Sequence, residues 1–566
     1  MSYFTCVGHF FQTRKLLVCL FLLLAFCFFI YYRTLAPSYT WQHWGSDAGD
    51  LIASVFTLGV PHPPGTPLYV LLAQPFRLLP FSDPAFKMNF ASSIFSLLCL
   101  LTLFLLVFEL TSNLTAGSLS VLFLAFSPVF WSQSIITEVY TLNAFLVSLV
   151  IYFLCRWQIT GIGNRWLYLA IFTFGLTLCN HTSSLMLFPA ILYLILAIKG
   201  KKALRPSFLF SLFFCLFLGL LPYLYLPLRA RANPPLNWGD PKTLNRFLAH
   251  IMGSEYKEML FYKNQRLVLD SAINFFLSLF RNFNFLGITL AALGLFFGFV
   301  RKKLLLNFSI FVFLFQLLFN ANYKIPNIET FYLPSFFIFS VWIGLGAAEV
   351  LSFLERLKSL LSKKWSVVLI SLESPPVLGG KIWELSLSHF LIFTLILGLF
   401  LGPFWSFFKF YKEVDLSSDF EAVSYGEGVF KRLEKNAIVI TEGDKFTLIL
   451  DYYRWVVYSD REDVAVFPNG IYFQDWRLNN AKRFYPWVKF PDFPLAKNGE
   501  EAMEALLALI EANYQNYPVY LTLDYPPPKE EIATRTQIDS FIIQSDGPIY
   551  KVIGKTEENK RRTLPN

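Results

Sequence analysis

The sequence has 566 residues, of which 55% are hydrophobic and only 15% are charged. This composition excludes an ordinary soluble fold, which could not keep so much apolar surface out of water, and it indicates a membrane protein. The formal net charge of +9 does not favour nucleic-acid binding, because most lysines and arginines stand in short clusters between apolar runs, where they set orientation in the membrane.

The first apolar run follows Arg14-Lys15 and ends at Tyr31-Tyr32-Arg33. A secretory signal peptide begins in the same way, but no small-x-small cleavage site follows cleanly, so we expect an uncleaved first span with an aromatic interface belt. With about 20 apolar residues per crossing, the sequence predicts eleven spans, near 16–33, 89–111, 117–137, 139–156, 165–180, 182–198, 207–228, 282–300, 304–320, 331–353 and 386–408.

Orientation follows from five short basic loops that fall on one side if every span is real. By the positive-inside rule that side is the cytoplasm, which also holds the N-terminus. The helix pairs that meet near Thr137 and His181 have almost no loop between them, so either pair could be a re-entrant element instead. The expected membrane domain is residues 1–408, with long external loops at 34–88 and 229–272.

Charged residues become frequent after about Lys409, and an odd number of spans leaves residues 409–566 outside as a separate soluble domain. Short apolar runs at 436–441, 463–468 and 518–523 are typical of buried strands, and 499–515 has helical periodicity. We therefore expect a small α/β domain. Glu442-Gly443-Asp444 ends the first strand, where such folds place ligands, although a capped turn explains it as well.

The conspicuous polar residues would face the external side: Asp47, Asp50, His62, Glu138, His181, and an arginine-rich loop. Each has a purely structural explanation. Asp47 could cap a helix with Asp50 at its third position, Glu138 and His181 could be satisfied interhelical hydrogen-bonding residues, and the loop's cations could be tolerated surface charge. Their shared side instead favours a binding or catalytic cavity that opens outward.

An acid at this surface could act as general base on a hydroxyl acceptor, and arginines at the lipid boundary could hold the phosphate of a lipid-linked sugar. Nucleotide sugars are cytosolic, so an outward-facing transferase needs a lipid-carried donor. The surrounding aromatic residues would suit stacking on a sugar or on a prenyl chain, although interface belts explain them equally well.

The stretch "DAGDLIASVFTLGVPHPPGTPLY" (47–69) resembles the signature of a membrane family, once a domain of unknown function, that includes the animal transmembrane protein O-mannosyltransferase. Further matches are "FWSQSIITEVYTLNAF" (130–145), "GLTLCNHTSSLMLFPA" (175–190), "LPLRARANPPLNWGDPKTLNRF" (226–247) and a bacterial-type portion at 441–467. The resemblance covers most of the chain.

The resemblance implies a C-class glycosyltransferase that uses a polyprenyl-phosphate sugar and inverts the anomeric carbon, with an acid of the first external loop as base. The family usually has Glu where this chain has Asp50, so we expect Asp47 to be the base and Asp50 to orient the acceptor or a neighbouring cation. Candidate substrate-binding residues are His62, Glu138, His181, Arg229, Arg231, Asn237 and Asp240, with the two arginines on the donor phosphate and Asn237 and Asp240 shaping the loop.

The acceptor stays open between a protein serine or threonine and a glycan, and the sugar between mannose and another hexose. We expect no cofactor and no metal, membrane lipids and the lipid-linked donor as partners, no nucleic acid, and a bacterial cytoplasmic membrane as location. The alternatives are a lipid-linked-sugar transporter or flippase, for which a repeat and midplane charges are lacking, and a non-catalytic protein that binds the lipid carrier.

Overall fold

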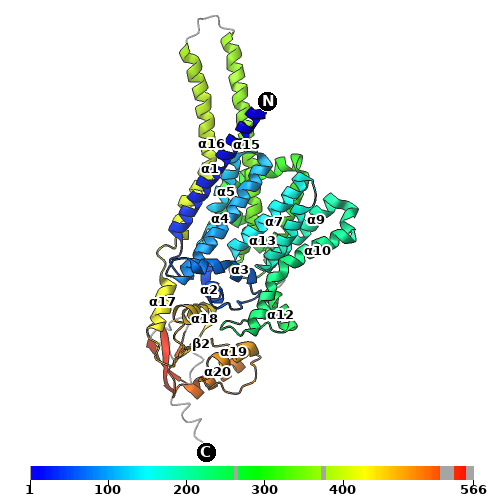
Figure 1. The fold of residues 1–566 in the computed structure, drawn as a ribbon. Coiled ribbons are helices and arrows are strands. Elements are labelled where there is room, and N and C mark those ends of the chain that lie inside the picture. Colours follow the sequence, from blue (N-terminus) through cyan, green and yellow to red (C-terminus); the bar gives the residue numbers. More distant parts are fainter. Residues whose placement is uncertain (1, 261–264, 371–377, 523–540, 556–566) are drawn as a thin grey trace, which may run out of the picture.

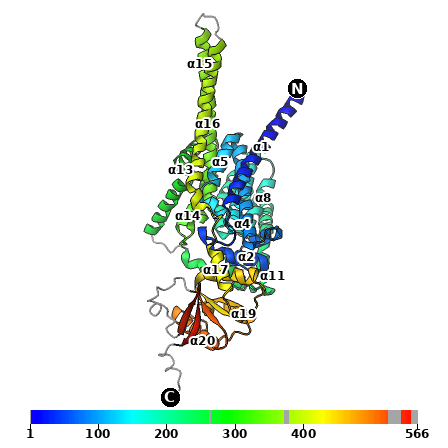
Figure 2. The same cartoon turned by 90° about the vertical axis from the view of Figure 1, so that its left-hand side faces the viewer.

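A computed structural model describes residues 2–260, 265–370, 378–522 and 541–555. The chain forms a bundle of long helices with a smaller α/β domain at one end (Figure 1). The N-terminus and the projecting parts of α15 and α16 lie at the opposite end of the bundle in both views (Figure 2). The C-terminal domain therefore caps one end of the helical bundle.

Apolar composition makes the long helices, because a helix satisfies its own backbone hydrogen bonds where water is absent. In the described residues, nine helical segments are long and apolar enough to cross a membrane, and two shorter apolar helices accompany them. The bundle helices are α1 (Ser2–Thr34), α4 (Pro84–Thr111), α5 (Leu114–Ala125), α6 (Pro128–Gln133), α7 (Tyr140–Thr160), α8 (Arg165–Leu178), α9 (Phe188–Lys199), α10 (Pro206–Leu220), α13 (Gln265–Arg301), α14 (Lys303–Ala321), α15 (Leu333–Ile370) and α16 (Leu378–Val414). Each of the eleven expected spans overlaps one of these segments, but 117–137 and 165–180 overlap only the two shorter helices. The chain is a multi-pass membrane protein.

The expected span 117–137 is wrong as a single helix. Helix α5 ends at Ala125, and α6 begins only at Pro128. Ser127 is extended (ψ 128°), as the residue before a proline tends to be, because the proline ring disfavours the helical conformation there. The chain between Gln133 and Tyr140 is then free to present Glu138 at the end of the bundle.

Shorter helices form the end of the bundle that faces the C-terminal domain. They are η1 (Gln42–Asp47), α2 (Ala48–Thr57), α3 (Pro67–Ala73), η2 (Gln74–Leu78), η3 (Thr182–Leu187), η5 (Leu221–Leu224), α11 (Tyr225–Arg231), α12 (Leu244–Ile251), η6 (Ser254–Met259) and η7 (Ile328–Tyr332), while η4 (Gly200–Leu204) joins α9 to α10. Helix α2 is buried along Ala48–Val55, so this polar-flanked helix lies inside the protein and not on its surface.

The C-terminal domain is an α/β fold, as predicted. Its sheet has the order β2-β1-β3-β5-β4, in which β1 is parallel to β2 and β3, and β5 is antiparallel to β3 and β4. The strands are β1 (Ile438–Thr441), β2 (Ala465–Pro468), β3 (Val519–Leu521), β4 (Phe541–Asp546) and β5 (Ile549–Lys555). The helices are α17 (Glu421–Phe430), α18 (Gly443–Tyr452), η8 (Tyr453–Val457), η9 (Ile471–Phe473), α19 (Asp475–Phe484) and α20 (Gly499–Asn513).

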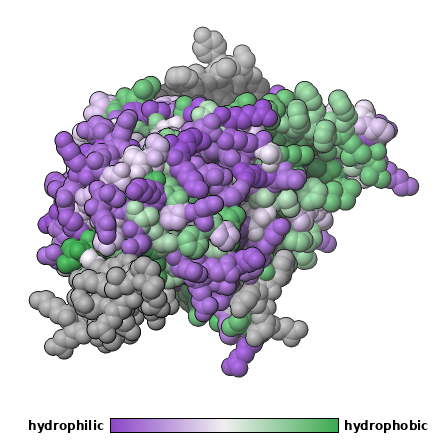
Figure 3. Space-filling model, turned by 90° about the horizontal axis from the view of Figure 1, so that it is seen from below, coloured by the Kyte–Doolittle hydropathy of each residue, from purple (hydrophilic) through white to green (hydrophobic). Residues whose placement is uncertain are grey.

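Helix α18 packs directly on α2, which fixes the C-terminal domain against the bundle. A Cβ atom added to Gly49 would lie 2.1 Å from the carbonyl oxygen of Leu448, so only glycine permits this approach. Tyr39 and Tyr452 stack with ring centroids 5.7 Å apart beside it. Seen from below, from the side of the C-terminal domain, the surface is mainly hydrophilic, with an apolar flank at one side (Figure 3).

Candidate functional site

Asp47 stands at the start of α2, where its carboxylate is not used as a helix cap. The residue occupies the N-cap position, but its side chain accepts no hydrogen bond from the backbone of the first turn. No hydrogen bond or ion pair of its carboxylate is found in the described part of the chain. The capping explanation therefore fails for Asp47, and its carboxylate is available for chemistry.

Asp50 lies one turn further along α2 and is 1% exposed. Its carboxylate forms hydrogen bonds with His62. Its Oδ2 accepts hydrogen bonds from the backbone N–H of His62 at 2.8 Å and from Nδ1 of the imidazole at 2.7 Å. Its Oδ1 is buried without a partner. Asp50 thus positions His62 with one oxygen and keeps the other free.

The surroundings of His62 favour the charged form of its imidazole. Burial alone would lower the pKa of the imidazole, but the hydrogen bond to Asp50 and the charges of Asp50 and Asp47 outweigh burial and raise the pKa to about 9. The surrounding loop turns at Gly65, whose φ of +88° is accessible to glycine. The proline-rich segment therefore places one imidazolium among carboxylates.

Glu138 is the third acid of this group. It is 3% exposed, its Oε2 accepts a hydrogen bond only from the N–H of its neighbour Val139 at 3.2 Å, and its Oε1 has no partner. Burial, and then the charge of Asp47, hold the pKa of Glu138 well above its ordinary value. No interhelical hydrogen bond of the Glu138 carboxyl group is found among the described residues, and its surroundings favour the protonated form.

Asp47 itself has a raised pKa, first because of burial and then because of the charges of Asp50 and Asp444, while His62 lowers it. Asp444 belongs to the first turn of α18, so the C-terminal domain acts on this carboxylate. We call Asp47, Asp50, His62 and Glu138 the acid cluster. A raised pKa makes Asp47 a stronger base once it is ionised.

His181 lies near the acid cluster but is not part of its hydrogen-bonding network. Its Nδ1 contacts the hydroxyl of Ser183 at 2.6 Å, and its ring packs against Phe331 and Tyr140 with centroids 4.8 and 5.5 Å apart. Burial and the charge of His62 lower the pKa of His181 to about 4. The imidazole of His181 therefore packs as a neutral ring among aromatic side chains. Within the described residues it makes no interhelical hydrogen bond, which the sequence had allowed for it.

The two candidate phosphate ligands, Arg229 and Arg231, lie at the end of α11. Nε of Arg229 donates a hydrogen bond at 2.7 Å to the carbonyl oxygen of Leu58, which caps α2. Arg231 is exposed, and no ion pair holds it among the described residues. Arg229 thus links α11 to α2, and Arg231 presents an unpaired guanidinium at the surface.

Asn237 and Asp240 shape the loop beside His62. The backbone of Val60 donates to the carbonyl oxygen of Leu236 at 2.8 Å and accepts from the N–H of Trp238 at 3.1 Å. Asp240 accepts a hydrogen bond from Asn237 Nδ2 at 2.7 Å and makes ion pairs, each at 3.0 Å, with Lys242 and Arg246. Oδ1 of Asn237 remains buried without a partner.

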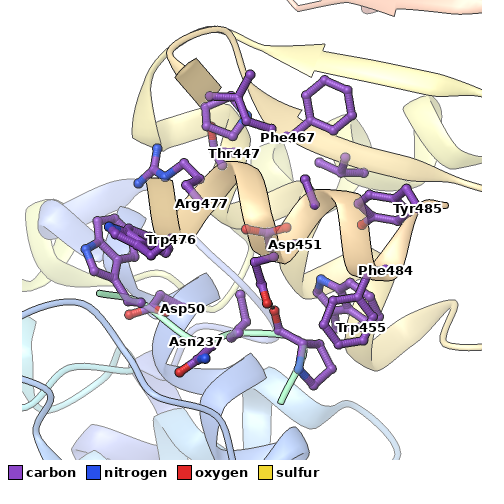
Figure 4. A pocket seen from close by; sticks show the side chains of 18 of the residues that line it. Asp50, Asn237, Thr447, Asp451, Trp455, Phe467, Trp476, Arg477, Phe484 and Tyr485 are labelled. Carbon is purple, nitrogen blue, oxygen red and sulfur yellow. Dashed lines mark hydrogen bonds between the residues drawn. The ribbon is translucent and has the colours of Figure 1, made fainter. Parts of the chain in front are cut away.

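Sequence reasoning missed the contribution of α18 and α19. A pocket lies between the bundle and the C-terminal domain, with Asp50 and Asn237 on one wall and Thr447, Asp451 and Arg477 on the other (Figure 4). Burial, followed by the charge of Asp50, raises the pKa of Asp451 to about 7. The one signal in the sequence was Glu442-Gly443-Asp444, at the start of α18.

No group of three or more His, Cys, Asp or Glu side chains suited to a metal ion occurs among the described residues. Within the acid cluster, the imidazole of His62 is hydrogen-bonded to the Asp50 carboxylate at 2.7 Å.

Residues 47–204 match the family described as protein O-mannosyl-transferase TMEM260 N-terminal domain. The chain is 26% identical to protein O-mannosyl-transferase tmem260 of Dictyostelium discoideum, over 97% of this chain and 68% of that protein. It is 28% identical to protein O-mannosyl-transferase TMEM260 of Mus musculus, over 79% of this chain and 62% of that protein. The resemblance to this O-mannosyltransferase family drawn from the sequence is confirmed, while its bacterial character stays a prediction. The chain spans about two thirds of the length of these relatives.

Solved structures show the same fold. ArnT from Cupriavidus metallidurans in the apo state has a TM-score of 0.57 at 11% identity, covering 95% of this chain and 98% of ArnT. The form of ArnT bound to undecaprenyl phosphate gives 0.56 at 13% identity, covering 98% and 99%. The chain therefore has the polytopic fold of the C-class glycosyltransferases, as predicted.

Proposed function

We propose that this chain is a membrane glycosyltransferase that moves a hexose from a polyprenyl-phosphate donor to a hydroxyl acceptor at the membrane face covered by the C-terminal domain. The observation that carries the proposal is the acid cluster, in which Asp47 has a free carboxylate near the half-buried imidazole of His62. The C-class fold, the names of the relatives, and an ArnT structure that holds undecaprenyl phosphate support it.

In this proposal Asp47 removes the proton of the acceptor hydroxyl while the hydroxyl oxygen attacks the anomeric carbon. The bond between that carbon and the phosphate oxygen breaks, its electron pair leaves with polyprenyl phosphate, and the configuration inverts. The raised pKa of Asp47 brings the base closer to the operating pH, which favours proton transfer.

His62 and Glu138 supply positive charge and a proton near the developing negative charge. The cluster holds three carboxyl groups and one imidazolium, and a neutral Glu138 reduces the repulsion that three carboxylates would have toward a phosphate. Asp50 orients His62 through two hydrogen bonds from one backbone N–H and one ring N–H. Arg229 and Arg231 are the proposed ligands of the donor phosphate, with the forked guanidinium geometry that phosphate favours.

The proposed orientation places the N-terminus in the cytoplasm and the C-terminal domain outside, in a bacterial cytoplasmic membrane. The structure supports opposite sides for the N-terminus and the C-terminal domain (Figure 1), and the five basic loops of the sequence favour the cytoplasm for the first of these. A lipid-carried donor suits a site on the external side.

The test is transfer by the purified protein in detergent, supplied with synthetic polyprenyl-phosphate hexoses and a mixture of peptide and glycan acceptors. Release of polyprenyl phosphate together with acceptor glycosylation supports the proposal. Asp47→Asn should lower kcat by about 10²- to 10⁴-fold, the usual contribution of a general base, with unchanged thermal unfolding because its carboxylate makes no bond.

The matched control is Asp460→Asn, an exposed acid of the C-terminal domain, which should transfer like the wild type. Equal rates in wild type and Asp47→Asn would reject Asp47 as base. Binding of the lipid donor by a wild type that never transfers its sugar would instead favour a carrier-binding protein or a flippase.

A further inference from the structure

The pocket between the bundle and the C-terminal domain has two walls that come from distant parts of the chain. Trp238, in the loop before α12, packs against Trp476 of α19 with ring centroids 5.6 Å apart. Asp50 of α2 faces Asp451 of α18 (Figure 4). The lining residues that bear polar or aromatic groups used below are Asp50, Asn237, Trp238, Asp451, Trp476 and Arg477.

Two buried oxygen atoms on the bundle wall lack hydrogen-bond partners. They are Oδ1 of Asp50, in a residue that is 1% exposed, and Oδ1 of Asn237, in a residue that is 4% exposed. A buried acceptor without a donor costs about 1–3 kcal/mol, and native proteins rarely leave such atoms unexplained. Both residues line the pocket, so a ligand with O–H donors would satisfy them.

Arg477 supplies a donor from the opposite wall. Its guanidinium carbon lies 4.8 Å from the ring centroid of Trp238 and 5.1 Å from that of Trp476. No hydrogen bond or ion pair engages this guanidinium within the part of the chain that the structure describes. Its N–H groups are therefore held in place by two indole rings and remain free to donate.

The charged, polar and aromatic groups that line the pocket favour some classes of ligand over others. Asp50 and Asp451 are two carboxyl groups against one guanidinium, which disfavours a phosphate in this pocket. The row of polar atoms disfavours a lipid tail. Saccharide hydroxyls both donate and accept, which matches acceptors on one wall and Arg477 on the other, and the apolar face of a sugar ring packs on indole rings such as Trp238 and Trp476.

We infer that this pocket binds a pyranose ring, whose hydroxyls donate to Asp50, Asn237 and Asp451 and accept from Arg477. The inference deepens the proposed function and rests on it for the source of the sugar. The same chemistry fits the hexose of the lipid-linked donor and a sugar of a glycan acceptor. In both cases the C-terminal domain forms part of the substrate site.

The first test is saturation-transfer NMR on the full-length protein in deuterated detergent. The probes are methyl α-mannoside, methyl α-glucoside, and a short-chain isoprenyl phosphate with and without mannose. We expect saturation of the ring protons in the wild type. Replacing charged hydrogen-bonding groups should weaken binding about 10- to 100-fold, so Asp451→Asn and Arg477→Gln should show this loss.

Trp476→Phe keeps an aromatic face and should retain most of the binding, whereas Trp476→Ala should lose it. Asp460→Asn is again the matched control for the carboxylate. Circular dichroism and size-exclusion chromatography identify variants that do not fold, and the Phe variant keeps the test decisive if the Ala variant fails. Ring-proton saturation that is equal in all variants, or absent in the wild type, would overturn the inference.

Transfer kinetics distinguish the two sources of the sugar. A donor sugar in the pocket requires that Asp451→Asn raise the KM for the donor, whereas a glycan acceptor requires that it raise the KM for the acceptor. Unchanged KM values for both substrates would contradict the inference.

The inference and the proposed function can fail separately. Asp47→Asn should bind the sugar probes as well as the wild type does, because Asp47 does not line this pocket. A wild type that binds the probes through Asp451 and Arg477 but transfers no sugar would reject the transferase and keep the pocket.

Discussion

The acid cluster and the pyranose pocket share Asp50, yet they are built in different ways. Three members of the cluster lie between residues 47 and 62 of the chain, and the short helix α2 with its proline-rich turn brings them together. The pocket joins Asp50 to Asp451 and Arg477, which only docking of the C-terminal domain places nearby. One region depends on local structure and the other on an interface between domains.

The two carboxylate oxygens of Asp50 serve these two regions separately. Oδ2 is used by His62 and organises the cluster, while Oδ1 is left for the pocket. Changes in the interface should therefore act on sugar binding first, and changes at His62 should act on the chemical step.

Among the changes that test this separation, the largest effect is expected for Gly49→Ala, which disrupts the packing at the interface. The new Cβ would lie 2.1 Å from the carbonyl oxygen of Leu448, so α18 must move away from α2. Overpacking of this kind costs about 1–3 kcal/mol, and we expect a lower unfolding temperature together with at least a tenfold loss of kcat/KM. The measurements are thermal unfolding and the transfer assay.

The matched control is Gly499→Ala, because a Cβ at Gly499 meets nothing within 4 Å. It should change neither quantity. If Gly49→Ala unfolds and transfers like the wild type, the C-terminal domain is not tied to the site through this contact.

The second prediction concerns pH and His62. Asp47 acts as base only when it is ionised, so kcat/KM should fall as the pH drops through its raised pKa. The cationic His62 is lost as the pH rises through about 9, so activity should also fall there, by about tenfold per pH unit. His62→Gln should lower kcat and abolish the alkaline limb, as a pH series of initial rates will show.

The same pKa gives a stability prediction of defined sign. The folded-state pKa of His62, about 9, lies above the ordinary value of 6.5. The contribution of the Asp50 pair to stability is therefore fully present below about pH 6.5 and is lost as the pH rises through 9. A wild type whose unfolding temperature changes between these values no more than that of His62→Gln would contradict the pairing.

A smaller effect is expected for Asn480→Ala. Nδ2 of Asn480 donates a hydrogen bond at 2.7 Å to the carbonyl oxygen of Pro235 and so holds α19 on the loop that carries Trp238. Loss of this bond should cost about 1 kcal/mol and raise the KM for the substrate whose sugar enters the pocket, with kcat nearly unchanged. Asn516→Ala, at an exposed asparagine of the same domain, is the control, and an equal KM in both variants would argue against this role.

Those parts of the fold could be predicted that are marked by a signal within a short stretch of sequence. Apolar runs located the membrane helices, and short apolar strands located β1, β2 and β3, because burial on both faces leaves a continuous apolar run. The break at Ser127-Pro128 was missed because hydropathy does not report a helix end, although the proline was a local signal.

Much the same holds for the candidate site. The sequence singled out Asp50 and His62 because they lie in the same motif as Asp47. It singled out Glu138 because that residue lies at the end of a helix pair. Asp451, Trp476 and Arg477 were not found, since no local pattern marks a residue that becomes important only when α18 meets α2. That Asp50 belongs to both the acid cluster and the pocket could not be predicted from the sequence, because it depends on which carboxylate oxygen of Asp50 contacts His62.

The smallest effect is expected for Glu138→Gln, and it distinguishes a proton donor from a charge. If Glu138 is neutral because of its burial and its proximity to Asp47, the amide keeps both the size and the ability to donate, so kcat should change by less than about tenfold. Glu138→Ala removes the donor and leaves a cavity next to Asp47, so its loss should be clearly larger, within the range of general acid catalysis. Measuring both variants in the transfer assay decides the point. A Gln variant as impaired as Asp47→Asn would mean that the ionised form of Glu138 is required and that the cluster works with three negative charges.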